Sequence, residues 1–104
     1  MLLTEKELFE KAIKDFGAEK QEEMAIEEMA ELIQAVCHKH RGRKSNIAEE
    51  IADVEIMIEQ LKIINRIPIY EIEGIKSEKL IRLAERLNLR NVTILKNTEV
   101  GNDS

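Results

Sequence analysis

Two short acidic motifs hold the residues of this sequence whose types and spacing could do chemistry. The first reads Glu-Glu-Met-Ala-Glu from Glu27, and the second reads Glu-Ile-Ala-Asp from Glu50. Each contains two carboxylates three residues apart at the edge of an apolar helical face: Glu28 with Glu31, and Glu50 with Asp53. Burying several like charges together is costly unless a positive charge holds them, and a divalent cation is a common partner. The motifs therefore predict a metal site.

Helical periodicity places the two acidic pairs at the same edge of two apolar faces. At about 100° of rotation per residue, Glu28 and Glu50 fall inside the apolar arcs of their helices. An antiparallel hairpin would bring the pairs together, provided that its loop absorbs an offset of about one to two turns. The core stripes expected on the two helices are Ala25, Met29, Leu32 and Val36, then Ile47, Ile51, Val54, Ile58 and Leu61.

The chemistry of the donor atoms indicates which cation to expect. Four carboxylates supply only oxygen, and hard oxygen ligands favour Mg²⁺ or Mn²⁺ over zinc or iron. A di-iron bundle site is disfavoured because no Glu-x-x-His motif is present. Glu27 and Glu49 lie on the outer sides of their helices, where a solvated or supporting role is expected. Orientation of a water molecule is a further possible role for Glu27.

The elements that must position these motifs can be recognised from capping and periodicity. Two capping-box patterns occur, Thr4 with Glu7 and Asn46 with Glu49. Pro68 marks a break, and the ambiguous segment 69–74 is expected to form a short turn of helix. Four helices are expected, at about 5–16, 18–39, 46–65 and 75–88.

These elements predict an all-α, four-helix, bundle-like domain over residues 1–90 and a short C-terminal tail over residues 91–104. A second apolar line on the third helix favours a homo-oligomer, either a dimer or a tetramer. That line comprises Ala48, Ala52, Ile56 and Ile63.

Composition excludes several other classes of protein. With 104 residues the chain suits one domain, and its net charge of −5 argues against a general nucleic-acid binder. No apolar run approaches membrane-spanning length. A single cysteine cannot form an internal disulfide, and no signal peptide is visible, so a cytoplasmic location is expected.

The pattern Glu-Glu-x-x-Glu, eighteen intervening residues and Glu-x-x-Asp resembles the MazG-like all-α nucleoside triphosphate pyrophosphohydrolases. The likeness spans about residues 20–65 and is strongest to small single-domain, phage-type members. It implies Mg²⁺-dependent cleavage of an NTP or dNTP into a monophosphate and pyrophosphate. It also implies oligomers whose sites are lined by more than one subunit. The metal ligands that it implies are Glu28, Glu31, Glu50 and Asp53.

A basic loop follows the second helix and includes Lys39, Arg43 and Lys44. One hypothesis is that these cations steer or bind phosphates. The alternative is a solvated turn that complements the helix C-terminus. His38 lies two turns beyond Glu31 on the same side, but a ligand role is disfavoured because histidine sites usually include more nitrogen or sulfur donors.

A different functional class also fits the acidic motifs. A non-catalytic helical oligomer or regulatory interaction module could retain the acidic patch as a structural metal site. Metal-dependent melting without turnover would distinguish this alternative from an enzyme.

Overall fold

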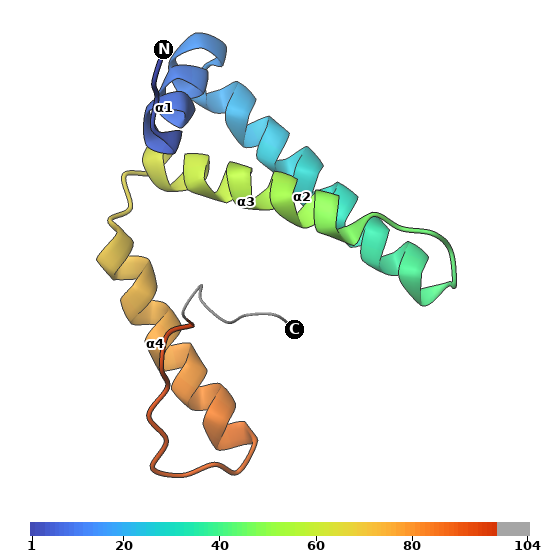
Figure 1. Ribbon diagram of the computed structural model, residues 1–104, viewed down its shortest axis with the longest axis vertical. Helices are drawn as coiled ribbons and strands as arrows, with labels where there is room; N and C mark the ends of the chain where they lie inside the picture. Colours follow the sequence, from blue (N-terminus) through green and yellow to red (C-terminus); the bar gives the residue numbers. More distant parts are fainter. Residues whose placement is uncertain (98–104) are drawn as a thin grey trace. The chain divides into compact units, whose positions relative to one another are not determined.

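The computed structural model describes residues 1–97 and contains four helices within that range, with no strand (Figure 1). The helices are α1 (Glu5–Phe16), α2 (Ala18–His40), α3 (Ile47–Ile64) and α4 (Ile69–Arg86). The prediction of an all-α protein with four helices is confirmed. The backbone divides into two compact units, Met1–Ile67 with α1 to α3, and a second unit from Pro68 onward with α4.

The predicted C-terminal tail is described only in part. Residues 91–97 form no helix or strand, and residues 98–104 lie outside the described range. Among the described helices, none combines the length and apolar character needed to cross a membrane.

Helix α1 begins and ends as its sequence predicts. The Thr4 hydroxyl accepts a hydrogen bond from the Glu7 N–H, and the Glu7 carboxylate accepts one from the Thr4 N–H, both at 3.0 Å. This reciprocal pair is the capping box, which satisfies two N–H groups that the helix itself leaves free. The helix ends at Phe16 because Gly17 adopts a φ of 94°, which L side chains rarely tolerate.

The second predicted capping box does not form. Asn46 occupies the N-cap position of α3, but its side-chain amide donates to the Glu49 carboxylate and caps no backbone N–H. Its ψ is 61°, whereas Thr4 has an extended ψ of 162°. Because a capping side chain needs the extended backbone to reach the first helical turn, Asn46 cannot play that role here.

Helix α4 starts at Ile69, so the ambiguous segment 69–74 is helical and the predicted start at residue 75 is wrong. Pro68 has φ −72° and ψ 149°, an extended N-cap geometry from which a helix can start directly. Gly74 lies inside the helix. A single glycine costs a helix about 1 kcal/mol relative to alanine, which is too little to end it.

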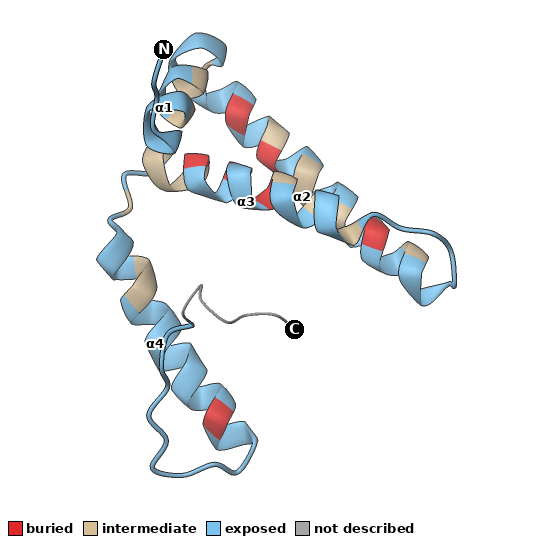
Figure 2. Ribbon diagram, in the orientation of Figure 1, coloured by how far each residue is buried: buried red, intermediate tan, exposed pale blue. Residues whose placement is uncertain are grey.

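Helices α2 and α3 form an antiparallel hairpin, and α1 packs against both (Figure 1). Buried residues occur at intervals along both helices of the hairpin (Figure 2). They are Gln21, Ala25 and Ala35 on α2, and Val54, Met57 and Gln60 on α3. The α3 residues recur every three positions, and Gln21 and Ala25 on α2 are four positions apart, spacings typical of a helix–helix seam.

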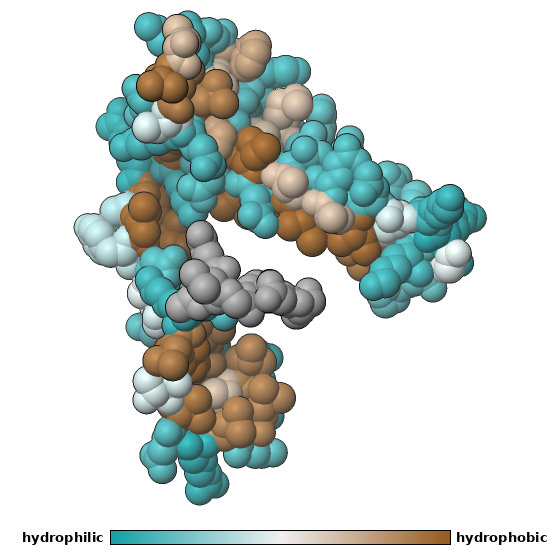
Figure 3. Space-filling model, viewed as in Figure 1, coloured by the Kyte–Doolittle hydropathy of each residue, from teal (hydrophilic) through white to brown (hydrophobic). Residues whose placement is uncertain are grey.

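The seam is rotated from the predicted core stripes toward the acidic edge of each helix. Val36, Ile51 and Ile58, which were expected in the core, are 40%, 42% and 38% exposed. Figure 3 shows hydrophobic side chains at the surface along the α2–α3 hairpin. These residues remain exposed because the apolar face of each helix is broader than the surface that one neighbouring helix can cover.

A buried amide pair joins the two helices near α1. The Gln21 side-chain amide donates to the Gln60 side-chain oxygen at 2.7 Å, and the two residues are only 7% and 4% exposed. A buried polar group without a partner costs more than a made hydrogen bond contributes. Each glutamine therefore depends on the other.

The variant Gln60→Met should lower the free energy of unfolding by about 1–3 kcal/mol, because it leaves the Gln21 amide buried and unpaired. Changing both residues to Met removes both polar groups and should recover most of that loss. Urea unfolding followed by circular dichroism gives the four values of this double-mutant cycle. Equal losses in the single and double variants would contradict the interpretation.

Candidate metal centre

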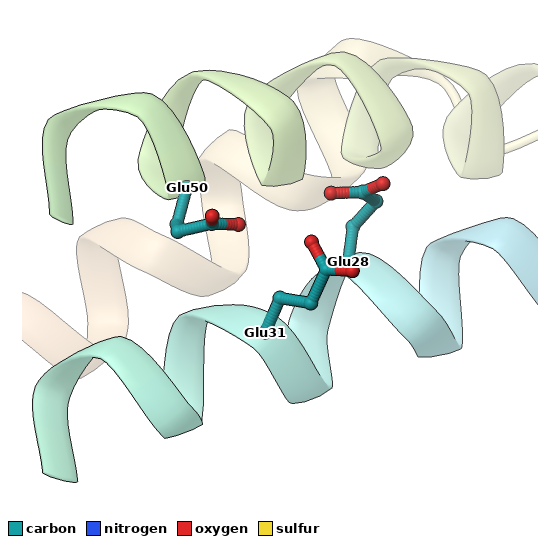
Figure 4. Close-up of side chains that lie close together, drawn as sticks. All are labelled: Glu28, Glu31 and Glu50. Atoms are coloured by element: carbon teal, nitrogen blue, oxygen red, sulfur yellow. The ribbon is translucent and has the colours of Figure 1, made fainter. Parts of the chain in front are cut away.

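Three of the four predicted carboxylates converge across the α2–α3 seam. Glu28 and Glu31 come from α2 and Glu50 comes from α3, and their side chains approach one another between the helices (Figure 4). Each offers one oxygen, and these oxygens all lie within 4.8 Å of one another. The acidic group is the set Glu28, Glu31 and Glu50.

Within residues 1–97, no positively charged side chain forms an ion pair with the acidic group. Glu28 and Glu50 are half-buried, and one oxygen of each, Oε2, is fully buried without a hydrogen-bond partner. The ion pairs found among residues 1–97 involve other carboxylates, those of Asp15, Glu59 and Glu73. Buried oxygens that accept no hydrogen bond are costly, and a bound cation would satisfy them.

Burial and mutual repulsion raise the pKa values of the two half-buried acids. For Glu28, desolvation is the largest cause of the raised pKa, followed by the charges of Glu31, Asp53 and Glu50. For Glu50, desolvation again comes first, followed by the charges of Glu31 and Asp53. A divalent cation would reverse this balance, since opposite charge favours the ionised carboxylate.

Asp53 lies beside the acidic group but is not among the converging residues. It is half-buried, and its charge contributes to the raised pKa values of Glu28 and Glu50. Glu27 is exposed and contributes no oxygen to the group. The structure thus places Asp53 within electrostatic reach of the centre and Glu27 on the outer side of α2.

A pocket of about 290 Å³ adjoins the acidic group on the side of the α2–α3 loop. Glu31 and Glu50 line it together with Lys44, so one predicted cation lies close to the carboxylates. Lys39 and Arg43 are exposed and do not line this pocket. Its other polar lining residues are Gln34, His38, Ser45 and Asn46.

Sequence spacing had already placed His38 on the same side as Glu31, and the same signal would have identified Gln34. Gln34 and His38 follow Glu31 at intervals of three and seven residues, which places them on the same side of one helix. Ser45 and Asn46 carry no comparable signal, because only the fold of the loop determines where they lie.

Acidification should stabilise the cation-free protein. The folded-state pKa values of Glu28 and Glu50 lie above the ordinary value of 4.5. At a pH between 4.5 and these raised pKa values, the folded state therefore binds protons that the unfolded chain does not. The free energy of unfolding should therefore rise as the pH falls from neutral toward 4.5. Glu7 acts oppositely at lower pH, since backbone and side-chain hydrogen bonds with Thr4 lower its pKa and its stabilising contribution is lost on protonation.

Thermal melting in EDTA at several pH values between 7 and 5 measures this effect. The double variant Glu28→Gln/Glu50→Gln is the control, and its melting temperature should vary less over the same range. Identical pH profiles for the wild type and the double variant would contradict the burial of these charges.

The donor set fits a small, hard cation. Three carboxylates converging from two helices supply anionic oxygens alone, which suits Mg²⁺ or Mn²⁺. Open space beside them leaves room for water or a phosphate oxygen to complete the coordination. No protein-family model, curated protein or solved structure matches the chain.

Proposed function

We propose that the chain is a Mg²⁺-dependent nucleoside triphosphate pyrophosphohydrolase, active in the cytoplasm and also able to use Mn²⁺. It would convert an NTP or dNTP and water into the monophosphate and pyrophosphate, a reaction suited to keeping nucleotide pools clean. The observation that supports this proposal most directly is the acidic group, in which two half-buried carboxylates each have a buried oxygen without a hydrogen-bond partner. The resemblance of the acidic motifs to the MazG-like family supports the same residues.

In this proposal Glu28, Glu31 and Glu50 hold the cation, and Asp53 adds negative charge beside them. A bound divalent cation supplies Lewis-acid polarisation of the phosphates and activation of water. The water oxygen bonds to the α-phosphorus while the bond from that phosphorus to the α–β bridging oxygen breaks. The attacking water releases one proton to solvent, and the pyrophosphate leaves with the electron pair of the broken bond. Lys44 lies where it can offset the charge of phosphate oxygens.

The direct test is pyrophosphate release from a panel of canonical NTPs and dNTPs, measured with Mg²⁺, with Mn²⁺ and with EDTA. The proposal expects release that requires the metal and differs among substrates. Absence of release across the panel and a set of modified nucleotides would refute the enzymatic function.

A second candidate function is favoured by the position of the acidic group in the seam between α2 and α3 (Figure 4). A cation at this position would tie the two helices together, so it could serve stability in a non-catalytic helical oligomer or regulatory module. This candidate expects metal-dependent melting together with no turnover of any nucleotide.

We also propose a homo-oligomer, a dimer or a tetramer, as the working form. The support is apolar surface that α1 to α3 leave uncovered (Figure 3). Its large exposed side chains on the hairpin are Ile26, Ile33, Val36, Ile51, Ile56 and Ile58. Light scattering coupled to size exclusion should give a whole multiple of the monomer mass, and a monomer at high protein concentration would refute this.

A further inference from the structure

The pocket beside the acidic group has a polarity that indicates which part of a substrate it could take. Glu31 and Glu50 form one side, and the α2–α3 loop contributes Lys44, Ser45 and Asn46. Among the described residues that line it, Ala35 alone is apolar, and none offers an aromatic or large aliphatic side chain against which a base could stack. An ammonium group, a hydroxyl and amides are donors that phosphate oxygens accept from.

The size of the pocket also indicates that it takes only part of a nucleotide. Sites that bury most of a drug-sized ligand measure roughly 300–1,000 Å³. At about 290 Å³ the pocket lies just below that range, and it is bounded on one side by the carboxylates. It therefore suits a fragment of a nucleotide better than a whole one.

The N-terminus of α3 adds a positive electrostatic potential that favours an anion. Asn46 and Glu50, which flank the first turn of this 18-residue helix, both line the pocket. No side chain caps that turn, since the Asn46 amide donates to Glu49 instead. The positive end of the helix dipole therefore lies at this edge of the pocket, where it adds to the positive charge of Lys44.

We propose that this pocket binds the β- and γ-phosphates of the substrate and then the pyrophosphate formed from them. Lys44 and His38 are the contacting side chains. This inference rests on the proposed function and adds the direction in which the phosphate chain of the substrate lies. Because Glu31 and Glu50 line the pocket and Glu28 does not, the phosphate chain runs from the acidic group toward the α2–α3 loop. The nucleoside lies outside this pocket, so free pyrophosphate binds without a base.

Isothermal titration of pyrophosphate into the full-length protein, in the presence of Mg²⁺, tests this assignment without relying on turnover. The Lys44→Met variant should weaken binding by about tenfold, since a charge-assisted hydrogen bond is lost. The His38→Ala variant should weaken it by about threefold, the effect of one ordinary hydrogen bond. Both residues are surface-accessible, and circular dichroism verifies that the variants keep their helices.

The matched control is Lys6→Met, which removes one exposed positive charge from the same unit but away from the pocket. It should leave the pyrophosphate affinity unchanged, and adenosine should not displace bound pyrophosphate. Equal affinities of Lys44→Met and the control would overturn the assignment, and so would competition by adenosine.

The outcomes separate this inference from the proposed function. Metal-dependent release from NTPs combined with an unaltered pyrophosphate affinity in Lys44→Met would leave the enzyme in place and refute the pocket. Lys44-dependent binding of pyrophosphate without turnover of any nucleotide would support the pocket and refute the enzyme.

Discussion

The Glu50→Gln variant should release pyrophosphate at a rate two to three orders of magnitude below that of the wild type. Glu50 is the only member of the acidic group that α3 supplies, so its neutralisation leaves the cation held from one helix alone. A loss of about 100- to 1,000-fold is typical when one contact that stabilises transition-state charge is removed. Steady-state kinetics at saturating Mg²⁺ and substrate measures it.

The same variant should fold at least as well as the wild type when no metal is present. Glutamine removes a half-buried charge whose pKa burial and neighbouring carboxylates raise, so the repulsion in the seam falls. The matched control is Glu55→Gln, an identical change at an exposed position of α3. An equal loss of activity in the control would rule out a specific role for Glu50. A Glu50→Gln protein that fails to fold would contradict the repulsion expected in the seam.

Divalent cation should stabilise the protein strongly, whether or not the protein is an enzyme. A ligand at 100 times its dissociation constant adds about 2.7 kcal/mol to the free energy of unfolding when only the folded state binds it. For a domain of this size that corresponds to a rise of about 10 °C or more in the melting temperature. Melting curves with Mg²⁺ or Mn²⁺, and after addition of EDTA, measure the effect.

The Glu28→Gln variant should abolish most of this stabilisation, since Glu28 supplies one of the three converging oxygens. Its neighbour Glu27 is exposed and outside the group, so Glu27→Gln should respond to metal like the wild type. A metal response that is the same in both variants would place the cation elsewhere on the chain.

Local sequence signals predicted most of the fold. The capping box at Thr4 and Glu7 predicted the start of α1 because it acts within one turn of backbone. The capping pattern at Asn46 failed because it depends on a backbone ψ that the loop determines. The start of α4 was missed because one glycine weakens a helix without ending it.

Helical spacing predicted that acidic side chains of two helices converge, but it did not predict where the helices meet. Spacing placed Glu28 and Glu50 inside the apolar arcs of their helices, and the structure brings both into the α2–α3 seam together with Glu31. The seam could not be located from one helix at a time, since a broad apolar arc offers several strips for packing. The loop residues Ser45 and Asn46 were missed for a related reason, because their place depends on how the hairpin closes.

The Gln21–Gln60 hydrogen bond favours one alignment of α2 and α3 along their axes. Gln21 precedes Glu28 by seven residues on α2, and Gln60 follows Asp53 by seven residues on α3, two helical turns in each case. Sliding one helix along the other by a turn, about 5.4 Å, would bury both amides without partners and would also separate the carboxylates. The chain therefore selects, before any cation arrives, the one alignment in which its mutually repelling acids come together.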